Sequence, residues 1–162
     1  MEYLEPRPRW LSRLLGRVLK TGEIAERKNQ LERDYEHGAI EIVRVEASRF
    51  AIGEELNGEV PILFFEVGEN ELLVLWGQWL YDPHVVTSHL LDLDELWERN
   101  AWFKYFELVR SPTSGIALSL KSIGRETVSS VGTVCAGQCL PPQPSAVIPG
   151  NLDMLLGDAS RA

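Results

Sequence analysis

Metal-capable side chains gather in one short stretch of the sequence. Asp82, His84 and His89 lie close together, and Asp92 and Asp94 follow them. Imidazole and carboxylate groups are common protein ligands of zinc and other divalent ions, so this stretch predicts a metal site formed by the first three residues. Such a site would support a metal-assisted hydrolase. Turn formation and helix capping explain the same aspartates without a metal.

Other catalytic patterns are weak in this sequence. It contains no nucleophile elbow, phosphate loop or dinucleotide-binding fingerprint. Glu66 lies in a strongly apolar stretch, where its charge needs a partner, and Arg44 or Arg110 could supply one across strands. With no motif that indicates a catalytic residue or a cofactor, we favour a non-enzymatic protein-interaction or regulatory module over the hydrolase.

The segment 8–20 has the pattern of a basic amphipathic helix. Trp10 and Leu14 recur at helical spacing, whereas Arg13 and Arg17 lie on the opposite face. Such a helix could cover the sheet of its own domain, bind a groove in a partner protein or lie on a membrane surface. We favour its own sheet first and a protein partner next, with Trp10, Arg13 and Arg17 as partner-binding residues, and we do not expect a membrane surface.

A second candidate docking segment lies near the end of the sequence. Residues 151–156 combine an acidic residue with Leu152, Leu155 and Leu156, and they follow a proline-rich stretch. Acidic and apolar strings of this kind bind partner proteins when they are exposed. The three leucines are therefore further predicted partner-binding residues.

Charge and composition exclude several classes of partner. The chain of 162 residues has a formal net charge of −8, and most of the acidic excess lies in residues 37–110, so we expect no nucleic-acid partner.

The apolar runs of the chain are shorter than the roughly 20 residues of a membrane-spanning helix. Since the N-terminal residues lack a signal-peptide pattern, we expect a cytoplasmic protein. In the cytoplasm Cys135 and Cys139 would be reduced thiols, and a local disulfide between them is the alternative.

The elements that must position these residues are mostly strands. Residues 60–81 have the pattern of a buried β-hairpin, in which two apolar arms flank a Gly-Glu-Asn turn. A second hairpin is predicted over 104–121, a strand over 41–48 and a short helix over 92–97. A charged helix over 23–36 is expected to follow the N-terminal amphipathic segment.

These elements predict an α+β fold. One or two N-terminal helices would pack on a twisted, mainly antiparallel sheet or half-barrel of about five strands. The chain would then divide into a basic amphipathic helix (1–22), an α+β domain (23–125) and a proline-rich, weakly structured C-terminal tail (126–162).

Four short motifs carry a resemblance to a known family. The chain has Phe-Glu-Val-Gly at 65–68, Gly-Gln-Trp-Leu-Tyr at 77–81, Glu-Leu-Val-Arg at 107–110 and Ser-Gly at 114–115. This series resembles an uncharacterised bacterial protein family with the pattern Phe-Asp-Val-Gly, Gly-Gln-Tyr-Leu-Tyr, Glu-Leu-Val-Arg and Ser-Gly. The present chain has Trp79 where that pattern has a tyrosine. The resemblance covers roughly residues 27–125. It implies a bacterial cytosolic domain and no particular activity or site.

Overall fold

The computed structural model describes residues 29, 32, 33, 36, 40–54, 60–112, 114–135 and 140–159. Residues 29, 32, 33 and 36 are helical, in agreement with the helix expected there. The predicted amphipathic helix, with Trp10, Arg13 and Arg17, lies outside the described residues.

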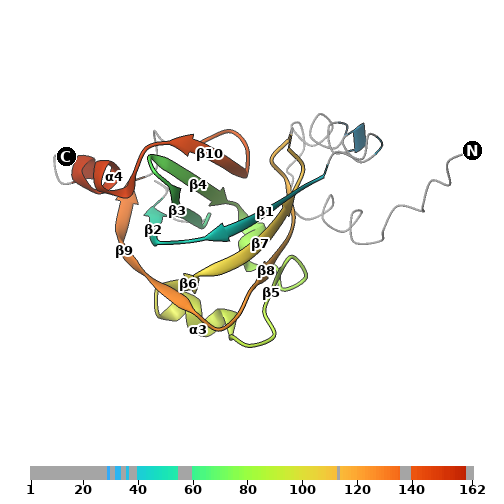
Figure 1. Ribbon diagram of the computed structural model, residues 1–162, viewed down its shortest axis with the longest axis horizontal. Coiled ribbons are helices and arrows are strands. Elements are labelled where there is room, and N and C mark those ends of the chain that lie inside the picture. The colour runs from blue at the N-terminus through green and yellow to red at the C-terminus, as the bar shows by residue number, and fades with distance from the viewer. Residues whose placement is uncertain are drawn as a thin grey trace, which may run out of the picture.

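Two mixed sheets form the body of the molecule (Figure 1). Within the described residues the strands are β1 (Glu41–Glu46), β2 (Arg49–Glu54), β3 (Ile62–Gly68), β4 (Glu71–Trp76), β5 (Val86–Thr87), β6 (Ala101–Phe103), β7 (Tyr105–Arg110), β8 (Ala117–Ser122), β9 (Thr127–Cys135) and β10 (Ser145–Pro149). One sheet has the order β1-β7-β8-β5, and the other has the order β10-β4-β3-β2-β9-β6. Neighbouring strands are antiparallel except β2 with β9 and β5 with β8.

The architecture is mainly β, so the expected α+β fold with helices packed on a five-stranded sheet is wrong. The described residues form ten strands and only two continuous helices, α3 (Leu93–Glu98) and α4 (Leu152–Ala159), together with the 3-10 turn η1 (Gln78–Tyr81). Strands beyond residue 125 account for part of the difference. In β9, Ser, Thr and Gly residues leave little apolar alternation to read, and the strand is held by pairing with β2 and β6.

Long strands bend and pass from one sheet to the other. The chain runs from β1 into β2 at Ala47, and from β6 into β7 at Lys104, and these two corners are joined by a hydrogen bond from Ala47 N to Lys104 O of 2.8 Å. Lys104 N in turn donates to Glu126 O, which lies between β8 and β9, at 3.0 Å. Strands that switch sheets at such corners produce a strongly curved, barrel-like arrangement.

The main core lies between the two sheets. Phe65 from β3 stacks on Phe50 from β2, with ring centroids 5.6 Å apart, and meets Phe106 from β7 edge-on at 5.2 Å. A second core, which includes Phe64 and Leu152, lies on the other face of β2, β3 and β4, under α4. Both faces of the β3–β4 hairpin are therefore buried, as its two apolar arms predict.

The second arm of the first hairpin is shorter than predicted. Strands β3 and β4 pair from Ile62 with Trp76 to Gly68 with Glu71, across a turn in which Asn70 has φ 58°. The second arm stops at Trp76 instead of continuing to residue 81. Gly77 has φ 128°, and the following residues wind into η1. The second predicted hairpin, β7 with β8, and the short helix α3 are confirmed.

The C-terminal part of the chain is built into the sheets. Residues expected to form a weakly structured tail instead supply β9, which pairs with β2 and β6, and β10, which pairs with β4. The proline-rich stretch is anchored as well, because the Trp76 indole Nε1 donates to Gln143 O at 2.7 Å and Trp76 N donates to Pro144 O at 3.0 Å. Helix α4 then packs across β9, β2 and β3.

Candidate functional site

The residues predicted to bind a metal do not converge. Asp82 accepts a hydrogen bond from His84 N at 2.9 Å and so closes the turn after η1, while the side chains of His84 and His89 are exposed. Asp92 caps α3 by accepting from Asp94 N at 3.0 Å. In the part of the chain that the structure describes, no three His, Cys, Asp or Glu side chains are arranged to hold a metal ion. Turn formation and capping therefore account for these aspartates.

The leucines predicted to bind a partner belong to the second core. Leu152 is fully buried, and Leu155 and Leu156 are half-buried against the same cluster. Leu156 lies so close to β9 that a Cβ at Gly132 would come within 3.0 Å of its Cδ2 atom. The apolar face of α4 therefore packs on its own chain, and the role of these leucines in binding a partner stays a prediction.

Glu66 is paired, but with neither of the predicted arginines. Its Oε1 atom lies 3.5 Å from Arg49 Nη1 and accepts a hydrogen bond from Leu152 N at 3.0 Å. A carboxylate at the first turn of a helix is favourable because it accepts from an otherwise unpaired backbone N–H. Arg44 and Arg110 pair with other carboxylates. Glu66 therefore fixes α4 to β3 and is not free for acid–base chemistry.

Asp153 completes the attachment of α4. Arg49 donates to both of its carboxylate oxygens, at 2.9 Å and 3.2 Å. Hydrogen bonding to Arg49 lowers the pKa of Asp153, and the same bond raises the pKa of Arg49. The pair is exposed to solvent, so its contribution to the free energy of folding is small.

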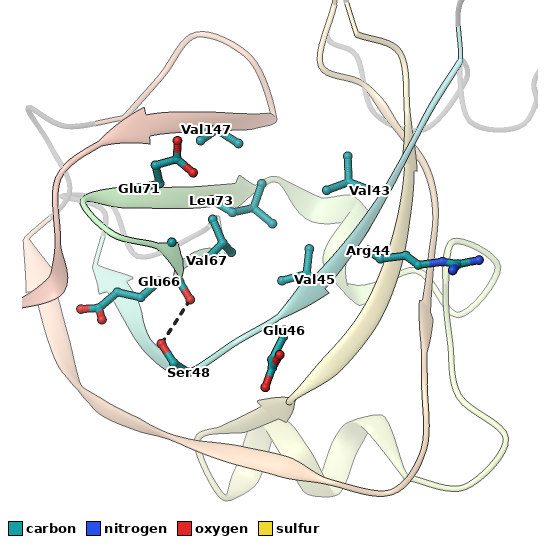
Figure 2. A pocket seen from close by; sticks show the side chains of 11 residues that line it. Val43, Arg44, Val45, Glu46, Ser48, Glu66, Val67, Glu71, Leu73 and Val147 are labelled. Atoms are coloured by element: carbon teal, nitrogen blue, oxygen red, sulfur yellow. Dashed lines mark hydrogen bonds between the residues drawn. The ribbon is translucent and has the colours of Figure 1, made fainter.

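A groove opens where the two sheets fail to close. Among the described residues β1 pairs with β7 alone and β10 pairs with β4 alone, so both strands have one free edge. Between β1 on one side and β3, β4 and β10 on the other lies a cavity of about 550 Å³, which we call the seam groove (Figure 2). It is the place where the interior of the curved sheets reaches the surface.

The floor of the seam groove is aliphatic. It consists of Val43 and Val45 from β1, Val67 from β3, Leu73 from β4 and Val147 from β10. Val67 sits at a bulge between the pairs Glu66–Leu72 and Gly68–Glu71, and bulges commonly re-aim a side chain. Leu73 and Val147 are directly opposite one another, yet Leu73 is 1% exposed and Val147 is 49% exposed. The floor thus runs from the main core out into solvent.

The rim of the seam groove is acidic. Glu46 and Glu71 are exposed carboxylates on its two sides, whereas the carboxylate of Glu66 faces Arg49 and Leu152 N. The side chain of Arg44 is 81% exposed, pairs with Glu107 at 3.3 Å and points away from the groove (Figure 2). The opening therefore presents negative charge around an apolar floor.

The polar groups of the groove are mainly carboxylates. Its described lining residues include no histidine, cysteine or tyrosine, and the hydroxyl of Ser48 donates to Glu66 O at 3.5 Å. The groove escapes sequence reasoning because its residues come from β1, from the β3–β4 hairpin and from β10, which lie apart in the sequence, and β10 lies in the stretch expected to be a weakly structured tail. The one available signal is Val147, a valine on a strand next to a proline-rich stretch.

No protein-family profile, curated protein or solved structure matches this chain. The resemblance to an uncharacterised bacterial family therefore stays a prediction. Over the described residues, no helix has both the length and the apolar character needed to cross a bilayer.

Proposed function

We propose that this protein is a non-enzymatic interaction module that binds a short peptide segment of another protein in the seam groove. The observation that carries the proposal is the aliphatic floor that leaves the core and reaches solvent at Val147, between two strand edges that no described strand covers. Free edges and exposed apolar grooves are the features by which sheet proteins bind peptides.

The groove also defines the chemistry of the peptide. One or two aliphatic or aromatic side chains would fill the floor, and each fully buried one would contribute roughly 1.5–3 kcal/mol. Basic residues beside them would face Glu46 and Glu71 at the rim, which would speed association and reject acidic peptides. The backbone edge of β1 offers further hydrogen-bonding groups.

We further propose that the module acts in the cytoplasm. Cys135 is an exposed free thiol, a state that is typical of reducing compartments.

A small apolar ligand would also match a cavity of about 550 Å³. The acidic rim and the free edges favour a peptide over such a ligand.

Selection from a library of short random peptides displayed against the immobilised full chain tests the proposal. Enriched peptides are expected to share basic residues next to an apolar one. When the best of them is added to the isotopically labelled chain, amide shifts should change along β1, at Gly68 and along β10. Shift changes centred on another face would contradict the proposal.

A further inference from the structure

We infer that residues 8–20 of the same chain occupy the seam groove and compete with the partner peptide for it. The inference rests on the proposed function, because it names the device that regulates that site. The groove is apolar with an acidic rim, and residues 8–20, which lie outside the described residues, combine apolar and basic side chains.

Charge is the first point of complementarity. Residues 8–20 contain Arg9, Arg13, Arg17 and Lys20 and no acidic residue. The groove has exposed carboxylates on both sides, and its one arginine is turned toward β7. Opposite charges of this kind attract over about 10 Å at moderate salt, so they would draw the segment to this opening. Arginine side chains are long enough to reach a rim while their helix lies over the floor.

Apolar content is the second point. Trp10, Leu14 and Val18 recur every fourth residue, and this spacing predicts a single row on one face of a helix. An amphipathic helix binds an apolar groove through such a row. The floor of the seam groove is the matching surface, since Val147 and the half-buried Val43 leave aliphatic area in contact with water.

The tether between segment and groove is long enough. Residues 21–42 separate Lys20 from Val43, the first residue of the floor. Even if all of this tether were helical, it would extend about 33 Å at 1.5 Å per residue. Strand β1 itself spans only about 20 Å at 3.3 Å per residue. A tether of this length gives an effective concentration on the order of millimolar, so a weak contact suffices for occupancy.

Paramagnetic broadening in the full chain tests the inference. A nitroxide is attached at Ser12→Cys in a chain that also carries Cys135→Ser and Cys139→Ser. Amides of Val45, Gly68 and Val147 are expected to lose most of their intensity, whereas amides of α3 keep most of theirs. Equal intensities at the groove and at α3 would overturn the inference. So would broadening that arises only between labelled and unlabelled molecules in a mixed sample, because a second copy would then supply the segment.

A charge exchange gives an independent readout. Arg13→Glu with Arg17→Glu should release the segment, abolish the broadening at the groove and raise the affinity for a selected peptide about tenfold. Adding Glu46→Arg and Glu71→Arg to that chain should restore the broadening. Failure of the exchange to restore it would count against a groove complex held by these charges.

The two proposals can fail separately. If a selected peptide binds the groove and the nitroxide leaves the groove amides sharp, the inference is wrong and the proposed function stands. If the nitroxide broadens the groove and no peptide is selected even by the Arg13→Glu, Arg17→Glu chain, the groove is a structural seat for residues 8–20. The proposed function is then wrong.

Discussion

At the scale of single residues, backbone conformation and local hydrogen bonds decide what the sequence motifs do. Asp82 and Asp92, which suggested metal ligands, accept hydrogen bonds from backbone N–H groups two residues later. Residue type alone does not separate these roles. An aspartate that precedes a turn or a helix is used locally far more often than it is aimed at a distant ligand.

Gly77 adopts a backbone conformation that favours glycine over any other residue. It has φ 128°, and a Cβ there would lie 2.8 Å from Trp79 Cδ1. We expect Gly77→Ala to lower the free energy of unfolding by about 1–3 kcal/mol in urea titrations. Gly157→Ala is the matched control, because a Cβ there meets nothing within 4 Å and alanine is the better helix former. Equal effects of the two substitutions would show that the strain at Gly77 is absent.

The Arg49–Asp153 pair predicts a pH dependence for the attachment of α4. Hydrogen bonding to Arg49 lowers the pKa of Asp153 below its ordinary value of 3.8. The stabilisation is therefore present above that value and is lost as the pH falls through the lowered pKa. Hydrogen exchange of α4 amides should accelerate, relative to the intrinsic rate, on acidification below pH 3.8, and Asp153→Asn should remove this step. An identical pH profile in the variant would rule out Asp153 as its source.

At the scale of elements, the sequence predicts the strands and helices that are marked by a pattern within their own residues. The β3–β4 and β7–β8 hairpins follow from apolar runs on either side of turn residues, and α3 follows from its capping aspartate. Strand β9 carries no comparable signal. Apart from the buried Val134 its residues are half-buried or exposed, and its position is set by partners 80 residues earlier, such as Phe50 opposite Ser130. Pairing at that distance is not encoded in any local pattern.

Helix α4 gives a stability test at the element scale. Leu152 is fully buried in the second core, whereas Met154 on the same helix is 62% exposed. Leu152→Ala should lower the free energy of unfolding by about 2–5 kcal/mol. Met154→Ala should change it by no more than about 0.5 kcal/mol. If both variants unfolded at the wild-type urea concentration, α4 would be a free docking segment instead of part of the core.

At the scale of the whole molecule, the decisive feature is the incomplete closure of the sheets. Strands that bend at Ala47 and Lys104 curve the two sheets around the main core, but β1 and β10 each keep one edge that no other described strand covers, on either side of the seam groove. Closure of a sheet depends on how many strands pair and in which order, and this is a property of the whole chain. The candidate site could therefore not be predicted from the residues that line it.

The most direct test of the account is the affinity of a selected peptide for the full chain and for two matched variants. Val147→Asp places a carboxylate on the groove floor, and Val131→Asp places one at a similarly exposed valine on β9, outside the groove lining. We predict that Val147→Asp weakens binding at least about tenfold, a loss of about 1.4 kcal/mol, while Val131→Asp leaves it unchanged. Equal affinities for the two variants would contradict the assignment of the seam groove as the binding site.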